Sequence, residues 1–196
     1  MTEQDLWALL TARFEQSTSL PLTFLSAEAE KIAAACQAMA RRFHQGGRLL
    51  AMGSGPFATD AQHISVEFVH PVILGKRALP ALALTNDSTV PGTALPAGPF
   101  ARHLRVLARA QDIALGFLPG GADQAIIEAL AVAQELGLLT LGLAGQEVSP
   151  STVDALDFCF AVPSCDLLLI QEVHETLYHI LWELVHIFLE HEGLLS

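Results

Sequence analysis

The chain has 196 residues and a formal net charge of −11, with only ten Lys and Arg residues. This balance argues against a nucleic-acid-binding surface, which needs clustered cations to neutralise phosphates. Hydrophobic residues make up 52% of the chain, but charges or His interrupt each apolar stretch before it reaches the ~20 residues of a membrane-spanning helix. We therefore expect the apolar excess to lie at an interface between copies of this chain.

The N-terminus and the cysteines indicate a cytoplasmic protein. The opening segment MTEQDLWALL is acidic and has no basic stretch followed by an apolar one, so it is not a secretory signal. The three cysteines are odd in number and show no C-x-x-C spacing, which favours free thiols in a reducing compartment. They are Cys36, Cys159 and Cys165.

Two helices are expected at the start of the chain, over residues 3–15 and 26–44. The first has one apolar face, and the second begins at Ser26 as a possible N-cap. Gly46 and Gly47 end the second helix. The apolar face of the first helix consists of Leu6, Leu9, Leu10 and Phe14.

Short apolar runs then alternate with amphipathic helical patterns. The runs cover 48–53, 78–85, 113–118, 138–145 and 158–163, and the helical patterns cover 58–70, 99–110, 123–136 and 167–192. This alternation predicts an α/β fold with a doubly wound, five-stranded parallel sheet flanked by helices. We expect one domain over residues 1–196, with a helical extension at 1–45 and an α/β core at 46–196.

The first candidate functional segment is MGSGPFATDAQHISVEF (52–68), in which a glycine turn joins a strand to a helix. The turn lacks the third glycine and the downstream acid of a dinucleotide site, so we exclude NAD. The helix places His63 and Glu67 four residues apart on one face. Such a pair can bind a metal or act in acid–base catalysis, although a surface ion pair has the same spacing.

The second segment is the long helical pattern at 167–186, where polar residues interrupt a strongly apolar sequence. Gln171, Glu175, Tyr178 and His179 lie near one face. Burying these groups without partners would be costly. They therefore indicate either a site or an oligomer interface in which the polar groups satisfy one another.

The third segment is the loop at 116–129 between a strand and a helix. Backbone N–H groups of Gly120 and Gly121 can hold an anion at such a turn. Asp123 is the expected N-cap of the following helix. Its carboxylate would stand where a phosphate binds, so we expect a weakened phosphate site.

These segments, in this order and spacing, resemble the phosphoheptose isomerase branch of the sugar-isomerase (SIS) family from about residue 25 to the end. Members carry a glycine turn and then a helix with H-x-x-x-E, here His63 and Glu67. They end on a helix with Q-E-x-H and a second His, here QEVHETLYH (171–179). LPALALTND (79–87) also matches a family segment.

The resemblance implies a flavodoxin- or Rossmann-like SIS fold, a homotetramer with sites between subunits, and a sugar-derived ligand. It implies a zinc ion bound by His63, Glu67, Gln171 and His179, with Glu67 and His179 as the acid–base pair. Residues that would contact the sugar are Ser54, Asn86, Asp87, Gly120, Gly121 and Gln171. Because Gln171 and His179 are ~12 Å apart along one helix, a site that uses both would need two chains.

The chain also departs from the family pattern. The family's Ser/Thr-rich phosphate loop is Leu118–Asp123 here and contains no hydroxyl group. Phe57 replaces a serine of the first loop, and the family arginine is missing unless Lys76 or Arg77 replaces it. Three functions therefore stay open: a divergent sugar or sugar-phosphate isomerase, a non-catalytic protein that binds a sugar derivative or another protein, and a metal-binding scaffold.

Overall fold

All five expected strands form, and they pair into one parallel sheet. The computed structural model describes residues 1–85, 98–120 and 123–195. The strand order is β2-β1-β3-β4-β5. The strands are β1 (Leu49–Met52), β2 (Ala81–Leu84), β3 (Ile113–Leu118), β4 (Leu139–Gly145) and β5 (Phe158–Val162). The chain adds β2 on one side of β1 and then adds β3, β4 and β5 on the other side, so the strand order reverses between β1 and β3. Open α/β sheets bind ligands at the carboxyl ends of the strands beside such a point.

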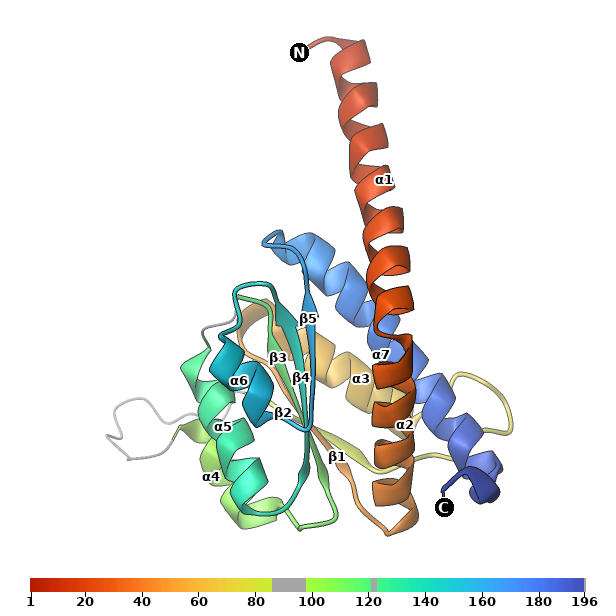
Figure 1. Ribbon diagram of the computed structural model, residues 1–196, viewed down its shortest axis with the longest axis vertical. Coiled ribbons are helices and arrows are strands. Elements are labelled where there is room, and N and C mark those ends of the chain that lie inside the picture. The colour runs from red at the N-terminus through yellow and green to blue at the C-terminus, as the bar shows by residue number, and fades with distance from the viewer. Residues whose placement is uncertain (86–97, 121–122, 196) are drawn as a thin grey trace.

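Helices cover both faces of the sheet (Figure 1). One face carries α2 (Ala29–His44), α3 (Ala58–Val69) and α7 (Leu167–Glu190), and the other carries α4 (Pro99–Leu107), α5 (Gln124–Glu135) and α6 (Pro150–Ala155). The doubly wound α/β prediction is therefore confirmed. The sequence analysis did not predict α6.

Successive strand residues alternate between two cores, as the pleat of a strand requires. Leu49 and Ala51 of β1 join the core beneath α2, α3 and α7. Leu50 and Met52 join the core beneath α4 and α5. Both faces of the sheet are thus apolar, which explains why the strands read as continuous hydrophobic runs.

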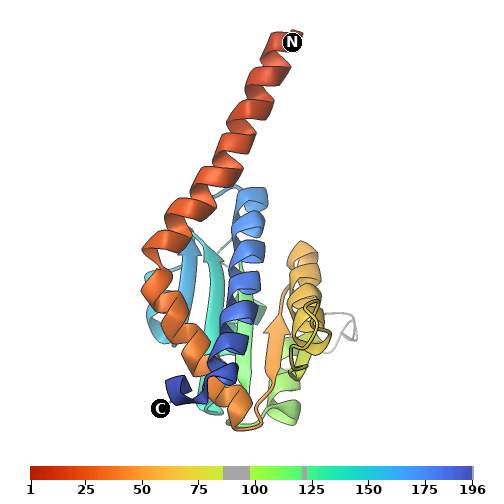
Figure 2. The same cartoon turned by 90° about the vertical axis from the view of Figure 1, so that its right-hand side faces the viewer.

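The first helix is longer than expected. α1 runs from Glu3 to Ala27 rather than over 3–15, and it projects well beyond the sheet in both views (Figures 1 and 2). It continues through Pro21, although proline removes one helical N–H donor. Ser26 lies inside α1, so its expected role as the N-cap of the next helix is wrong; α2 begins after Glu28 without a side-chain cap.

The outer part of α1 exposes large apolar side chains, from 47% of Leu6 to 68% of Phe14. The exposed set also includes Trp7, Leu9 and Leu10. The apolar face expected from the sequence is therefore present but is not covered by the rest of this chain. Within the described residues, none of the helices combines the length and the apolarity needed to cross a membrane.

A buried histidine joins α7 to the sheet. The His174 ring is fully buried, and its Nε2 lies 3.2 Å from the carbonyl oxygen of Ala144 at the end of β4. Burial lowers the pKa of His174 to about 4. The ring is therefore neutral at physiological pH, with Nε2–H donating to the carbonyl and Nδ1 buried without a partner among the described residues.

This histidine should make the protein less stable in acid. In the unfolded chain His174 takes up a proton below about pH 6.5, whereas in the folded chain it does so only near pH 4, so stability is lost as pH falls between these values. The loss is about 3 kcal/mol in the free energy of unfolding. We expect His174→Gln, which can still donate to Ala144, to remove that part of the pH dependence in urea titrations from pH 7 to pH 4. Parallel stability curves for the variant and the wild type would contradict this.

Candidate functional site

A tight glycine turn joins β1 to α3. A Cβ atom on Gly53 would lie 2.1 Å from the carbonyl oxygen of Phe57, so only glycine fits there. Gly55 has a φ of +54°, which also favours glycine, and it begins a short 3-10 helix, Gly55–Phe57. The two glycines therefore serve to start α3 immediately at the carboxyl end of β1.

The helices α3 and α7 run in the same direction because each follows the carboxyl end of a parallel strand. Their polar faces consequently meet in register. Gln171 Nε2 donates to Asp60 Oδ2 at 2.9 Å. One turn further along α3, His63 Nδ1 lies 2.8 Å from the Tyr178 hydroxyl.

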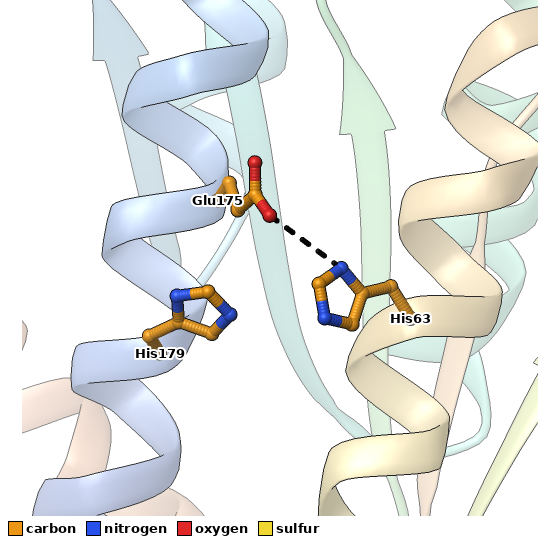
Figure 3. Close-up of side chains that lie close together, drawn as sticks. All are labelled: His63, Glu175 and His179. Carbon is orange, nitrogen blue, oxygen red and sulfur yellow. Dashed lines mark ion pairs between the residues drawn. The ribbon is translucent and has the colours of Figure 1, made fainter.

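The next turn pairs Glu67 with the histidines. Its Oε1 lies 2.9 Å from His179 Nε2 and 3.4 Å from His63 Nε2. Figure 3 shows His63 on α3 pointing toward Glu175 and His179 on α7. The polar residues of the two helices thus form one cluster, and it contains His63, Glu67 and His179, which the family resemblance assigns to one site.

Glu67 has two oxygens in different environments. Oε1 lies beside both imidazoles, whereas Oε2 is buried and has no hydrogen-bond partner among the described residues. The side chain lines a cavity of about 310 Å³ together with His179. Because the Glu67 side chain lines this cavity, its carboxylate is a candidate proton acceptor for a ligand bound there. The other described lining residues are Val72, Ile73, Trp182 and Glu183.

The surroundings of the cluster are acidic and partly desolvated. Among the described residues, no Lys or Arg lines the cavity. Burial raises the pKa of Asp60, and the hydrogen bond from Gln171 only partly opposes this effect. Burial also raises the pKa of Tyr178, helped by the negative charges of neighbouring carboxylates, so its hydroxyl keeps its proton.

The donor atoms of the cluster fit a tetrahedral metal ion. Zinc bonds of 2.0–2.1 Å to nitrogen and oxygen place neighbouring ligand atoms roughly 3.3 Å apart. The separations of 2.9 and 3.4 Å around Glu67 Oε1 are close to that value. Ligand atoms of His63, Glu175 and His179 also lie within 4.8 Å of one another. Glu67 Oε1 and the two imidazoles therefore fit zinc as a set of ligands, by chemistry and by these two distances.

Other residues expected at the site lie in different places. Gln171 is bonded to Asp60 and lies two turns along α7 from His179. Ser54 and Gly120 follow β1 and β3, which are neighbours in the sheet, so they flank the same edge. Asn86, Asp87 and Gly121 lie outside the described residues.

Several site residues had no role assigned from the sequence. Glu175 and Tyr178 were placed on the polar face of the long helix without a function, and Asp60 was not considered. Asp60 lies three residues before His63 and seven before Glu67, so helical spacing alone places it on the same face. Trp182 donates from Nε1 to the carbonyl oxygen of Glu67, 2.9 Å away, a contact that no spacing rule reveals.

The loops expected to hold a phosphate are engaged elsewhere. Asp123 caps α5 as expected, and it accepts from the N–H groups of Ala125 at 3.1 Å and Ile126 at 3.2 Å. The N-terminal N–H groups of α5 therefore already face a carboxylate of the chain itself.

The residues at the other positions that depart from the family pattern also have partners within the chain. Phe57 is buried in the core, and Lys76 pairs with Glu190 at 2.7 Å.

Comparisons with known proteins agree with this architecture. The SIS domain family model matches residues 14–145. A phosphoheptose isomerase from Solidesulfovibrio magneticus is 36% identical, over 92% of this chain and 90% of the relative. One from Roseiflexus sp. is 35% identical, over 87% and 88%. The solved structure of a phosphoheptose isomerase from Francisella tularensis superposes with a TM-score of 0.84 at 26% identity, over 95% of this chain and all of that one.

Proposed function

The chain belongs to the SIS domain family, and from this premise we propose that it is a sugar-phosphate isomerase that interconverts an aldose and a ketose. The observation that carries the proposal is the environment of the Glu67 carboxylate. Its Oε1 lies beside His63 and His179, its Oε2 has no partner among the described residues, and the Glu67 side chain lines a cavity. The relatives named phosphoheptose isomerase support the same class of reaction. The non-catalytic alternative has no such support.

In the proposed reaction Glu67 moves a proton between adjacent carbons. Its carboxylate removes the proton from the carbon next to the substrate carbonyl, and the carbonyl oxygen takes a proton from His179, which gives an enediol. The second hydroxyl then returns a proton to His179, and Glu67 delivers its proton to the neighbouring carbon. Atoms and charges balance over the cycle, and the two residues end as they began.

The residues that would hold a divalent zinc ion are His63, Glu67 and His179. When bound there, zinc would polarise the substrate carbonyl and stabilise negative charge on its oxygen. Gln171 is occupied by Asp60 of its own chain, which leaves the fourth position for the substrate or, as the family resemblance implies, for a group from a second chain.

We expect Glu67→Gln to abolish isomerisation while preserving substrate binding. The amide has the shape of the carboxylate but cannot accept the proton, and general acid–base catalysis contributes roughly 10²–10⁴-fold to a rate. The measurement is kcat and KM with a panel of aldose and ketose phosphates. Glu135→Gln on α5, at the opposite face of the sheet, is the matched control. An undiminished kcat in Glu67→Gln would exclude Glu67 as the base.

The substrate is proposed to be a sugar or sugar phosphate whose phosphate is held weakly. The chain lacks hydroxyl groups throughout Leu118–Asp123, and Asp123 occupies the N-terminus of α5. Each charge-assisted hydrogen bond to a phosphate contributes roughly 1.5–3 kcal/mol. Losing two or three of them would reduce affinity by a factor on the order of a thousand.

We therefore expect sedoheptulose 7-phosphate to bind poorly, as measured by calorimetry. Asp123→Ser keeps an oxygen to cap α5 but removes the negative charge, so it should tighten binding about two- to fivefold. Glu135→Gln removes a carboxylate elsewhere and should leave the affinity unchanged. A low-micromolar dissociation constant for the wild-type protein would show that the phosphate is held by other groups.

A homotetramer is also proposed, assembled through the projecting α1 and the neighbouring helices. The exposed apolar side chains of α1 and the family resemblance support it. A second apolar surface lies where α1 and α2 meet α7, and Leu25, Ile32, Ile180 and Leu184 line a groove of about 320 Å³ there. A cytoplasmic location remains an expectation from the N-terminal sequence and the cysteines.

Sedimentation at micromolar concentration tests the assembly. The wild-type protein should sediment as a species about four times the chain mass of 21.0 kDa. Leu10→Asp places a charge in the apolar face of α1 and should produce smaller species. Val106→Asp, at a side chain that is 82% exposed on α4, is the matched control and should not. A monomeric wild-type protein would overturn the proposal.

A further inference from the structure

Tyr178 is the only tyrosine of the chain, and its ring is fully buried on the site face of α7. The ring packs edge-on against Phe117, with centroids 6.3 Å apart, and against His63, with centroids 5.3 Å apart. Because these contacts hold the ring, the position of its hydroxyl is fixed. Among the described residues, the hydrogen-bond partner of that hydroxyl is His63 Nδ1, at 2.8 Å.

His63 needs such an anchor because its side chain is 42% exposed. An imidazole this open to solvent on a helix surface can turn about its χ angles unless something holds it. Glu175 is the other group near Nδ1, but its Oε1 is 3.8 Å away, beyond hydrogen-bond distance. The Tyr178 hydroxyl is therefore the group that fixes which nitrogen faces the site.

We infer that Tyr178 is a positioning residue, which fixes His63 as the tautomer protonated on Nε2. If the buried hydroxyl accepted from Nδ1–H, its own proton would have no partner among the described residues, so it donates to Nδ1 and the proton of the neutral ring lies on Nε2. That nitrogen faces Glu67 Oε1 at 3.4 Å.

The tautomer of His63 also affects the orientation of the Glu67 carboxylate. With His63 Nε2–H and His179 Nε2 both directed at Oε1, the Glu67 carboxylate is held in one orientation. The hydroxyl can also accept a hydrogen bond. If Nε2 binds zinc, Nδ1 carries the ring proton and donates it to the hydroxyl, so the orientation of the ring is kept.

The tautomer can be observed directly by ¹⁵N NMR of histidine side chains in the metal-free protein above pH 7.5. The His63 signals are identified by their loss in His63→Gln. We expect the Nε2–H tautomer in the wild type and in Glu175→Gln, and a mixture of tautomers in Tyr178→Phe. The phenylalanine keeps the buried ring and its packing, and the backbone spectrum confirms the fold.

Zinc titration and turnover give two further readouts. Groups that orient a metal-binding histidine typically change metal affinity or activity 10–100-fold, so Tyr178→Phe should weaken zinc binding by about that factor and lower kcat with little change in KM. The kinetic expectation rests on the proposed isomerase function, whereas the tautomer does not. If the wild type turns over no sugar phosphate, the proposed function fails and the NMR result still decides the role of Tyr178.

Three results would overturn the inference. They are an Nδ1–H tautomer in the wild type, an unchanged Nε2–H tautomer in Tyr178→Phe, and loss of the tautomer in Glu175→Gln. The last would identify Glu175 as the anchor of His63. The first needs no variant, so the inference can be tested even if Tyr178→Phe does not fold.

Discussion

The site depends on one constraint, the parallel alignment of α3 and α7. Both helices start at the carboxyl edge of a parallel sheet, so both run back across the same face in the same direction. Polar residues about two turns apart on one helix therefore meet polar residues about two turns apart on the other. The pairs Asp60–Gln171 and Glu67–His179 result from this register, as does the contact between His63 and Tyr178.

The same register explains how such polar groups are tolerated in a largely apolar helix. An unpaired buried polar group costs free energy, and most of these groups find a partner across the helix interface. Further along α7, Trp182 donates to the carbonyl oxygen of Glu67, and the ring nitrogens of His186 lie 2.8 and 2.9 Å from the carbonyl oxygens of Trp182 and Arg77. Among the described residues of these two helices, the buried side-chain atoms without a partner are Glu67 Oε2, Glu172 Oε2 and His174 Nδ1. The Glu67 carboxylate is the group proposed to take the substrate proton.

The sequence analysis predicted most of the fold and half of the site. Continuous apolar runs predicted all five strands, and helical spacing with a glycine turn placed His63 and Glu67 on one face. Spacing gave no sign that Gln171 is bonded to Asp60 of its own chain, and its role at the metal, which the family resemblance implies, stays a prediction. The first helix was expected to end at residue 15, but α1 continues through Pro21 to Ala27.

The chain has the residues of the proposed acid–base centre but no hydroxyl group in Leu118–Asp123, so its chemistry and its substrate are separate questions. Proton abstraction by Glu67 is most directly tested by hydrogen exchange. The protein is incubated in D₂O with a panel of sugar phosphates and unphosphorylated sugars, and deuterium at the carbon next to the carbonyl is followed by NMR. We predict incorporation with at least one sugar by the wild type and none by Glu67→Gln. Undiminished incorporation by the variant, or none by the wild type with any sugar, would contradict the account.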